Sequence, residues 1–190
     1  MPLNSKQPRI EPLTPPYEEA AEAALARLGH TPIQLFRVWA RRPELVQGIA
    51  GWGGHYFSRR SALTLRQREL VIDRTTALCG ADYEWGVHVA AFAERAGFDA
   101  EQLASLATGG PADDCWDAAD RAVIAAVDEL RATADLSDAA WAALVSATGE
   151  DAAVELLLVC GWYHAVSFTV RALRLPLEPG TEPIAAHTAA

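Results

Sequence analysis

The sequence predicts an all-α protein with an antiparallel helical hairpin at its core. Apolar residues recur at helical spacing through most of the 190 residues. Capping boxes at 64–67 (TLRQ) and 99–102 (DAEQ) each mark the start of a helix. No segment alternates apolar and polar residues between turn signals, so the sequence predicts no strand.

The ends of the chain are rich in proline and are expected to be extended. Proline has a fixed φ and lacks a backbone donor, so residues 1–16 are predicted to form an N-terminal arm and residues 176–190 a C-terminal tail. Residues 17–175 are predicted to form one helical domain. Its first helical stripe comprises Tyr17, Ala21, Leu25 and Leu28.

Further helix starts are expected at Thr31-Pro32 and Arg42-Pro43, the second helix ending near Gly53-Gly54. The helix that begins at the 64–67 box should end at Gly80. Asp82 is expected to cap the following helix, which runs to Gly97.

Helical faces around 116–130 and 141–148 precede a long, nearly all-apolar helix at about 151–174. A helix of that composition is expected to be buried on several sides.

Composition excludes several classes of protein. The net charge is −9 and no run of Lys or Arg is present, which argues against a nucleic-acid partner. The most apolar stretch, 156–170, contains His164 and is shorter than the ~20 residues that span a bilayer, so no membrane partner is expected. Three cysteines without paired spacing, and an N-terminus unlike a signal peptide, predict a cytoplasmic protein.

The segment 69–88 (ELVIDRTTALCGADYEWGVH) carries the candidate chemistry. Glu84 and His88 are four residues apart and share a helical face. A short turn can bring Glu69 of the preceding helix beside His88, and Tyr83 is a candidate donor to a substrate oxygen. Burial and mutual attraction shift the pKa values of such a pair in opposite directions, which can poise it for proton transfer near neutral pH.

Structural readings of the same residues stay open. A Glu–His pair at i,i+4 is commonly a surface contact of about 0.2–0.5 kcal/mol. Glu69 can equally be a solvated residue among Arg66, Arg68 and Arg74.

Residues 36–178 resemble the carboxymuconolactone decarboxylase family, which includes alkylhydroperoxidase D. The resemblance rests on the hairpin at 63–106, on WDAADRAVIAAVDEL and LSDAAWAAL, and on VELLLVCGWYHAVSFTVRALRLPLE. It implies the alkylhydroperoxidase D-like helical bundle and places Glu69 and His88 in the family's Glu–His register. The two cysteine positions of the peroxidase branch are Ala81 and Glu84 here, and Tyr83 stands where a His is often found.

Three functional hypotheses follow. Without the cysteine pair, the resemblance favours a cofactor-free lyase or isomerase that acts on a small organic acid, lactone or carbonyl compound through Glu69, Glu84, His88 and Tyr83. A thiol peroxidase is disfavoured because it needs a low-pKa thiolate and a resolving thiol. A non-catalytic oligomeric binding protein is the third possibility.

Other candidates and partners are predicted as follows. His55, Tyr163 and His164 are candidate substrate-binding residues, each with a packing role as the alternative. No metal is expected, because one Glu-x-x-x-His occurs without a second motif, and no cofactor is required. The family resemblance also implies a homo-oligomer: a trimer, a dimer or a hexamer.

Overall fold

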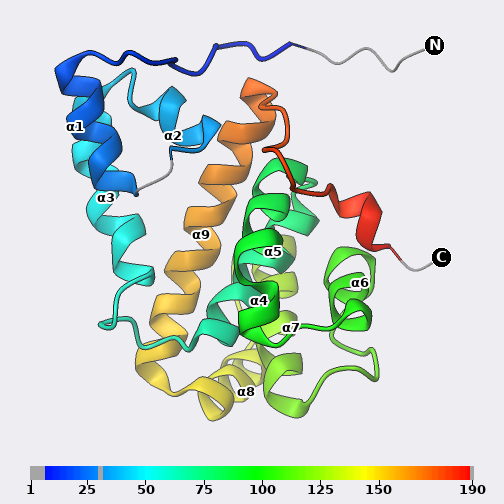
Figure 1. Ribbon diagram of the computed structural model, residues 1–190. Helices are drawn as coiled ribbons and strands as arrows, with labels where there is room; N and C mark the ends of the chain where they lie inside the picture. Colours follow the sequence, from blue (N-terminus) through cyan, green and yellow to red (C-terminus); the bar gives the residue numbers. More distant parts are fainter. Residues whose placement is uncertain (1–6, 30–31, 189–190) are drawn as a thin grey trace.

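The computed structural model describes residues 7–29 and 32–188, and these ranges are helical without any strand (Figure 1). The all-α prediction is therefore confirmed. In chain order the elements are α1 (Glu19–Leu28), α2 (Gln34–Trp39), α3 (Pro43–Tyr56), α4 (Leu65–Leu78), α5 (Asp82–Ala96), α6 (Ala100–Thr108), α7 (Ala118–Thr133), α8 (Asp138–Thr148), α9 (Glu150–Leu173) and the 3-10 helix η1 (Ile184–His187). The predicted start at Thr31 and the first six residues of the arm lie outside the described residues.

The antiparallel pair α4 and α5 forms the predicted hairpin. Thr64 caps α4 through the expected box, because its hydroxyl accepts from the Gln67 amide and the Gln67 side chain accepts from the Thr64 amide. Gly80 turns the chain with a φ of 63°, a left-handed conformation that glycine adopts without steric cost. The prediction for Asp82 was wrong: Ala81 is the N-cap of α5, and the Asp82 carboxylate accepts from the Ile184 amide instead.

Helix α4 lies at the centre of the bundle, against α5, α6, α7 and α9 (Figure 1). Its nine residues from 68 to 76 are all buried, although they include charged and hydroxyl side chains. Buried ionic groups are stable only when they are paired or neutral. Arg74 forms a two-bonded ion pair with Asp128 of α7, at 2.6 and 2.8 Å, and donates to the Leu106 carbonyl at the end of α6.

Helix α9 buries one face in the core and leaves another apolar face exposed, so it is less buried than expected. Leu156, Val159 and Val170 are buried in the main core, whereas Leu158 and Phe168 are 48% and 64% exposed. Among the described residues, α9 is the one helix long and apolar enough to cross a membrane, with 44% of its most apolar window buried. Core helices of soluble proteins meet the same criterion.

The first three helices pack around a small core of their own, which includes Ala21, Leu25 and Val46. In Figure 1 they stand beside α9, on the side away from α6 and α7. The described part of the N-terminal arm is extended and is bonded to the end of α9 through Arg9 N to the Leu173 carbonyl, at 2.9 Å.

The C-terminal tail is more ordered than predicted. It crosses to α5 and α6, against which η1 packs. A Cβ on Gly86 of α5 would lie 2.8 Å from the Glu182 carbonyl oxygen, so the tail makes backbone contact with α5.

Candidate active site

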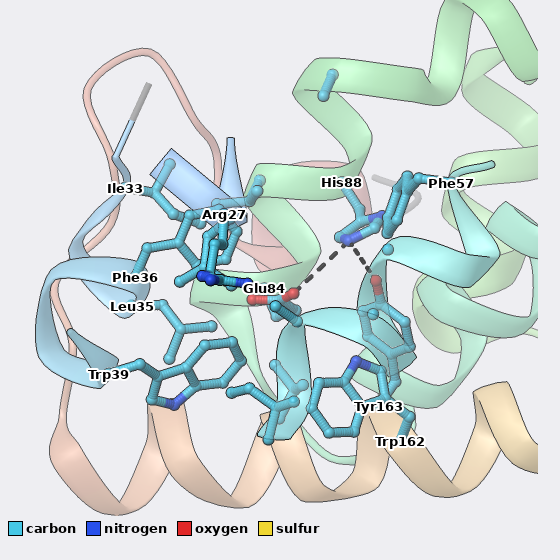
Figure 2. Close-up of a pocket in the computed structure, with 18 of the residues that line it drawn as sticks. Arg27, Ile33, Leu35, Phe36, Trp39, Phe57, Glu84, His88, Trp162 and Tyr163 are labelled. Carbon is cyan, nitrogen blue, oxygen red and sulfur yellow. Dashed lines mark hydrogen bonds and ion pairs between the residues drawn. The ribbon is translucent and has the colours of Figure 1, made fainter. Parts of the chain in front are cut away.

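A cavity of about 380 Å³ lies among α1, α2, α3, α5 and α9. Five aromatic side chains form much of its wall: Phe36, Trp39, Phe57, Phe92 and Trp162. Four lining side chains carry an ionisable group or a hydroxyl, namely Arg27, Glu84, His88 and Tyr163 (Figure 2). This apolar enclosure with a few convergent polar groups is the usual form of a small-molecule site.

Glu69 and His88 meet at the inner end of the cavity, as the hairpin predicted. The His88 Nδ1 donates to Glu69 Oε2 at 2.7 Å. Glu69 has no exposed surface and His88 is 4% exposed. The reading of Glu69 as a solvated residue is therefore wrong.

Arg68 completes this buried ion pair from the other side. Its guanidinium donates to Glu69 Oε1 at 2.7 Å and to the Tyr56 carbonyl at 3.0 Å. The same guanidinium lies over the Phe57 ring, 4.4 Å from the ring centroid. Each carboxylate oxygen of Glu69 thus pairs with one positively charged side chain, which offsets much of the cost of burying the carboxylate charge.

The second ring nitrogen of His88 faces Tyr163 and Glu84 (Figure 2). His88 Nε2 is 3.1 Å from the Tyr163 hydroxyl and 3.6 Å from Glu84 Oε1. The i,i+4 pair predicted on α5 thus faces the cavity, and α9 contributes Tyr163 to the same group.

The surroundings of His88 favour the imidazolium ion. Burial alone lowers its pKa, but the charges and hydrogen bonds of Glu69 and Glu84 outweigh burial and raise that pKa to about 10. Both ring nitrogens then donate, Nδ1 to Glu69 and Nε2 to the Tyr163 oxygen. The geometry therefore does not favour the predicted proton transfer by His88 near neutral pH, because His88 stays protonated well above pH 7.

Asp73 is the buried acid of this cluster that the sequence interpretation missed. It has no exposed surface, and neither carboxylate oxygen has a hydrogen-bond partner within the described residues. Burial and the charge of Glu69 raise the pKa of Asp73 well above its usual value, which favours the neutral acid. Its position four residues after Glu69 on a buried helix is the signal that would have identified it.

Glu69, Asp73 and His88 are also the one group in the described ranges with three ligand atoms within 4.8 Å of one another, a spacing that could hold a metal ion. The positive charges of Arg68 and His88 already match the negative charges of Glu69 and Glu84, with Asp73 neutral. Both oxygens of Glu69 already accept hydrogen bonds, one from Arg68 and one from His88.

Tyr83 is not at the cavity, which corrects its predicted role as a donor to a substrate oxygen. Its hydroxyl donates to Glu178 Oε1 at 2.5 Å and accepts from the Leu35 amide at 3.1 Å. Glu178 Oε1 also accepts from the Gln34 amide. Tyr83 therefore satisfies the first turn of α2, whose residues Leu35 and Trp39 line the cavity.

His55 and His164 also lie outside the cavity lining. The His55 Nε2 pairs with Glu155 at 3.0 Å, and its side chain is 41% exposed. The His164 Nδ1 donates to the Cys160 carbonyl one turn earlier at 2.9 Å. The structure does not bring these two residues to the cavity, whereas Tyr163, the third candidate, lines it.

The three cysteines are free, and none lines the cavity. Burial raises the pKa of Cys79, Cys115 and Cys160. Raised pKa values reduce the thiolate fraction that peroxide reduction requires.

The comparisons with known proteins agree with this geometry. The carboxymuconolactone decarboxylase family model matches residues 43–129, a range that contains Glu69, Glu84 and His88. The crystal structure of a variant of the debrominase Bmp8 in complex with 2,3,4-tribromopyrrole has a similar fold, with a TM-score of 0.67, 18% identity and 97% coverage of each chain. No curated protein matches the sequence. Residues 43–129 therefore resemble the carboxymuconolactone decarboxylase family, and the chain shares the helical fold of the debrominase structure.

Proposed function

We propose that this protein is a cofactor-free lyase or isomerase that uses acid–base chemistry on a small organic acid, lactone or related carbonyl compound. The observation that carries the proposal is the buried chain Glu69–His88–Tyr163, which ends beside Glu84 at an aromatic-lined cavity. Perturbed titratable groups that converge on an enclosed pocket are characteristic of active sites.

Tyr163 takes the role that the sequence interpretation gave to Tyr83. Its oxygen accepts from the His88 imidazolium, and no acceptor for its own O–H proton is found among the described residues. That O–H can donate to a substrate carbonyl oxygen, and the positive charge behind it stabilises the oxyanion that forms there. Burial and the neighbouring carboxylates raise the pKa of Tyr163, so it remains a neutral donor.

Glu84 is the proton carrier in this proposal. In an isomerisation, its carboxylate takes a proton from the carbon beside the carbonyl, the electron pair moves to the carbonyl oxygen, and the proton returns at another carbon. In a decarboxylation, the bond to the departing CO₂ breaks and the same oxygen receives the electron pair. Glu84 then passes a proton from solvent water to the carbon and ends ionised, as it began.

The neighbouring debrominase supports a small-molecule role for this fold. Its variant was captured with 2,3,4-tribromopyrrole, a small aromatic ring. The raised thiol pKa values and the cavity lining argue against a thiol peroxidase. The cytoplasmic location remains a prediction.

His88→Gln tests the proposal. Gln keeps polarity but cannot carry the charge, so turnover is expected to fall about 10²–10³-fold, as when an oxyanion donor is lost. Deuterium incorporation from D₂O into a panel of unsaturated lactones and keto acids, followed by NMR, measures the activity. His164→Gln is the matched control on α9 and should retain it.

Equal turnover by His88→Gln and the wild type would contradict the proposal. Loss of deuterium exchange in a variant with all three cysteines replaced by alanine would also contradict it.

A further inference from the structure

Glu84 has a buried carboxylate oxygen to which the described residues supply no donor. Its Oε1 faces His88 at 3.6 Å, whereas its Oε2 is buried and has no partner within the described part of the chain. Glu84 is 5% exposed and lines the cavity. A buried acceptor without a donor destabilises the protein, so a ligand that brings a donor recovers that energy.

The carboxylate is placed where a ligand can reach it. In Figure 2 the Glu84 side chain points between Arg27 and His88, toward the space that the aromatic rings surround. The terminal torsion of a glutamate rotates over a broad, twofold profile, so Oε2 can turn to meet a donor in the cavity.

The walls favour a flat ligand. Trp39 and Trp162 lie with ring centroids 6.1 Å apart, and Trp52 stacks on the outer side of the pair at 5.5 Å from Trp162. Phe57 and Phe92 form a second aromatic pair at 5.8 Å. These spacings are those of rings in direct contact, so the pairs form continuous aromatic walls, and such walls bind planar rings by stacking and edge contacts. A cavity of about 380 Å³ suits one or two rings.

We infer that the cavity binds a small planar unsaturated ring that carries an acidic O–H or N–H, and that this group donates to Glu84 Oε2. Phenols, pyrroles and the enol forms of cyclic carbonyl compounds belong to this class. The inference rests on the proposed function in taking this cavity as the substrate site. It makes Glu84 the residue that selects substrates by their donor group.

Arg27 extends the same specificity. It lines the cavity, and no ion-pair partner for it is found among the described residues. An anionic substituent on the ring can therefore be bound by its guanidinium, while the donor group faces Glu84.

A pair of probes that differ only in the donor tests the inference. Isothermal titration calorimetry compares 4-chlorophenol with 4-chloroanisole, whose methyl group replaces the acidic hydrogen. Wild-type protein is expected to bind the phenol at least about tenfold more tightly, as for a site built around a hydrogen bond. In Glu84→Gln the preference should fall below about threefold, and in Glu84→Leu it should disappear.

Glu94→Gln is the matched control, because Glu94 is an exposed residue of the same helix; it should keep the full preference. Thermal melts confirm that each variant is folded, and Glu84→Gln preserves the shape of the side chain if Glu84→Leu does not fold. Equal binding of the two probes, binding of neither, or an unchanged preference in Glu84→Gln would overturn the inference. Because no turnover is measured, these outcomes are independent of the His88→Gln test of the proposed function.

Discussion

Each charged side chain in the buried cluster has its charge matched by a neighbour. Arg68 and His88 hold the two oxygens of Glu69, and Glu84 lies on the other side of the imidazole ring. Asp73 is left without a partner among the described residues and is favoured as the neutral acid. The cluster therefore carries no net charge while it holds an imidazolium beside an apolar cavity, which is an arrangement suited to stabilising a developing anion.

Asp73→Asn is expected to stabilise the protein at neutral pH. The folded state raises the pKa of Asp73. Above about pH 4 the Asp73 carboxyl therefore ionises more readily in the unfolded chain than in the folded protein, and this favours unfolding. Asn does not ionise, and its advantage should be present at pH 7.5 and vanish as the pH falls toward 4. Differential scanning calorimetry at both pH values measures it.

The opposite result would identify a cation at Glu69, Asp73 and His88. In that case Asp73→Asn lowers the melting temperature at pH 7.5, and EDTA lowers that of the wild type.

Tyr83→Phe separates positioning from catalysis. Loss of the hydroxyl leaves the Leu35 amide without an acceptor, and we expect a loss of about 1–2 kcal/mol in the free energy of unfolding by urea. Because α2 carries part of the cavity wall, KM should rise while kcat stays within a few fold. Tyr163→Phe is the contrasting variant, whose kcat should fall by about 10²-fold. A large drop in kcat for Tyr83→Phe, with KM unchanged, would return Tyr83 to the catalytic group.

At the scale of helices, the sequence located the hairpin well because local signals define it. The Thr64 box, the Gly80 turn and the four-residue spacing of Glu84 and His88 act within a few residues, and the structure bears them out. Tyr83 was misplaced because its partners, Leu35 and Glu178, are 48 and 95 residues away. Such long-range contacts leave no periodic signal in a single sequence.

The exposed face of α9 carries an apolar stripe with heptad spacing. Its members follow one another at intervals of four and three residues and are all exposed; they are Val154, Leu158, Gly161, Ala165, Phe168 and Ala172. This spacing is typical of helices that pair with another helix. We expect this stripe to form the contact in the predicted homo-oligomer.

Phe168→Glu tests that expectation. A buried charge in the stripe should convert the assembly to monomers without unfolding the chain, as measured by size-exclusion chromatography with light scattering. Ala139→Glu, at an exposed position of α8, is the control and should leave the assembly intact. A wild-type monomer, or an assembly that Phe168→Glu does not change, would refute the role of the stripe.

For the whole molecule, the sequence and its family resemblance predicted the fold and the Glu69–His88 pair. The remaining features of the site arise from the packing of distant helices. Glu69 and His88 were found because a short turn joins their helices. The aromatic wall, the position of Tyr163 at the cavity and the unpaired Asp73 depend on how α2, α3 and α9 pack around the hairpin. Those contacts join residues far apart in the chain, so composition and periodicity cannot predict them.

The pH dependence of stability follows from the same packing. The raised pKa of His88 contributes stability that is fully present below about pH 6.5 and is lost as the pH rises through about 10. An alkaline loss of stability in the wild type that is smaller in His88→Gln is the expected signature.

Titration of His88 by NMR tests the central claim most directly. The chemical shift of its ring Cε1–H, assigned by comparison with His88→Gln, should stay that of an imidazolium through pH 8 and change near pH 10. In Glu69→Gln the pKa of His88 should fall, because burial still disfavours the imidazolium ion while the negative charge that stabilises it is gone. A wild-type ring that titrates near pH 6.5, and is unaffected by Glu69→Gln, would contradict the buried ion pair on which the proposed chemistry depends.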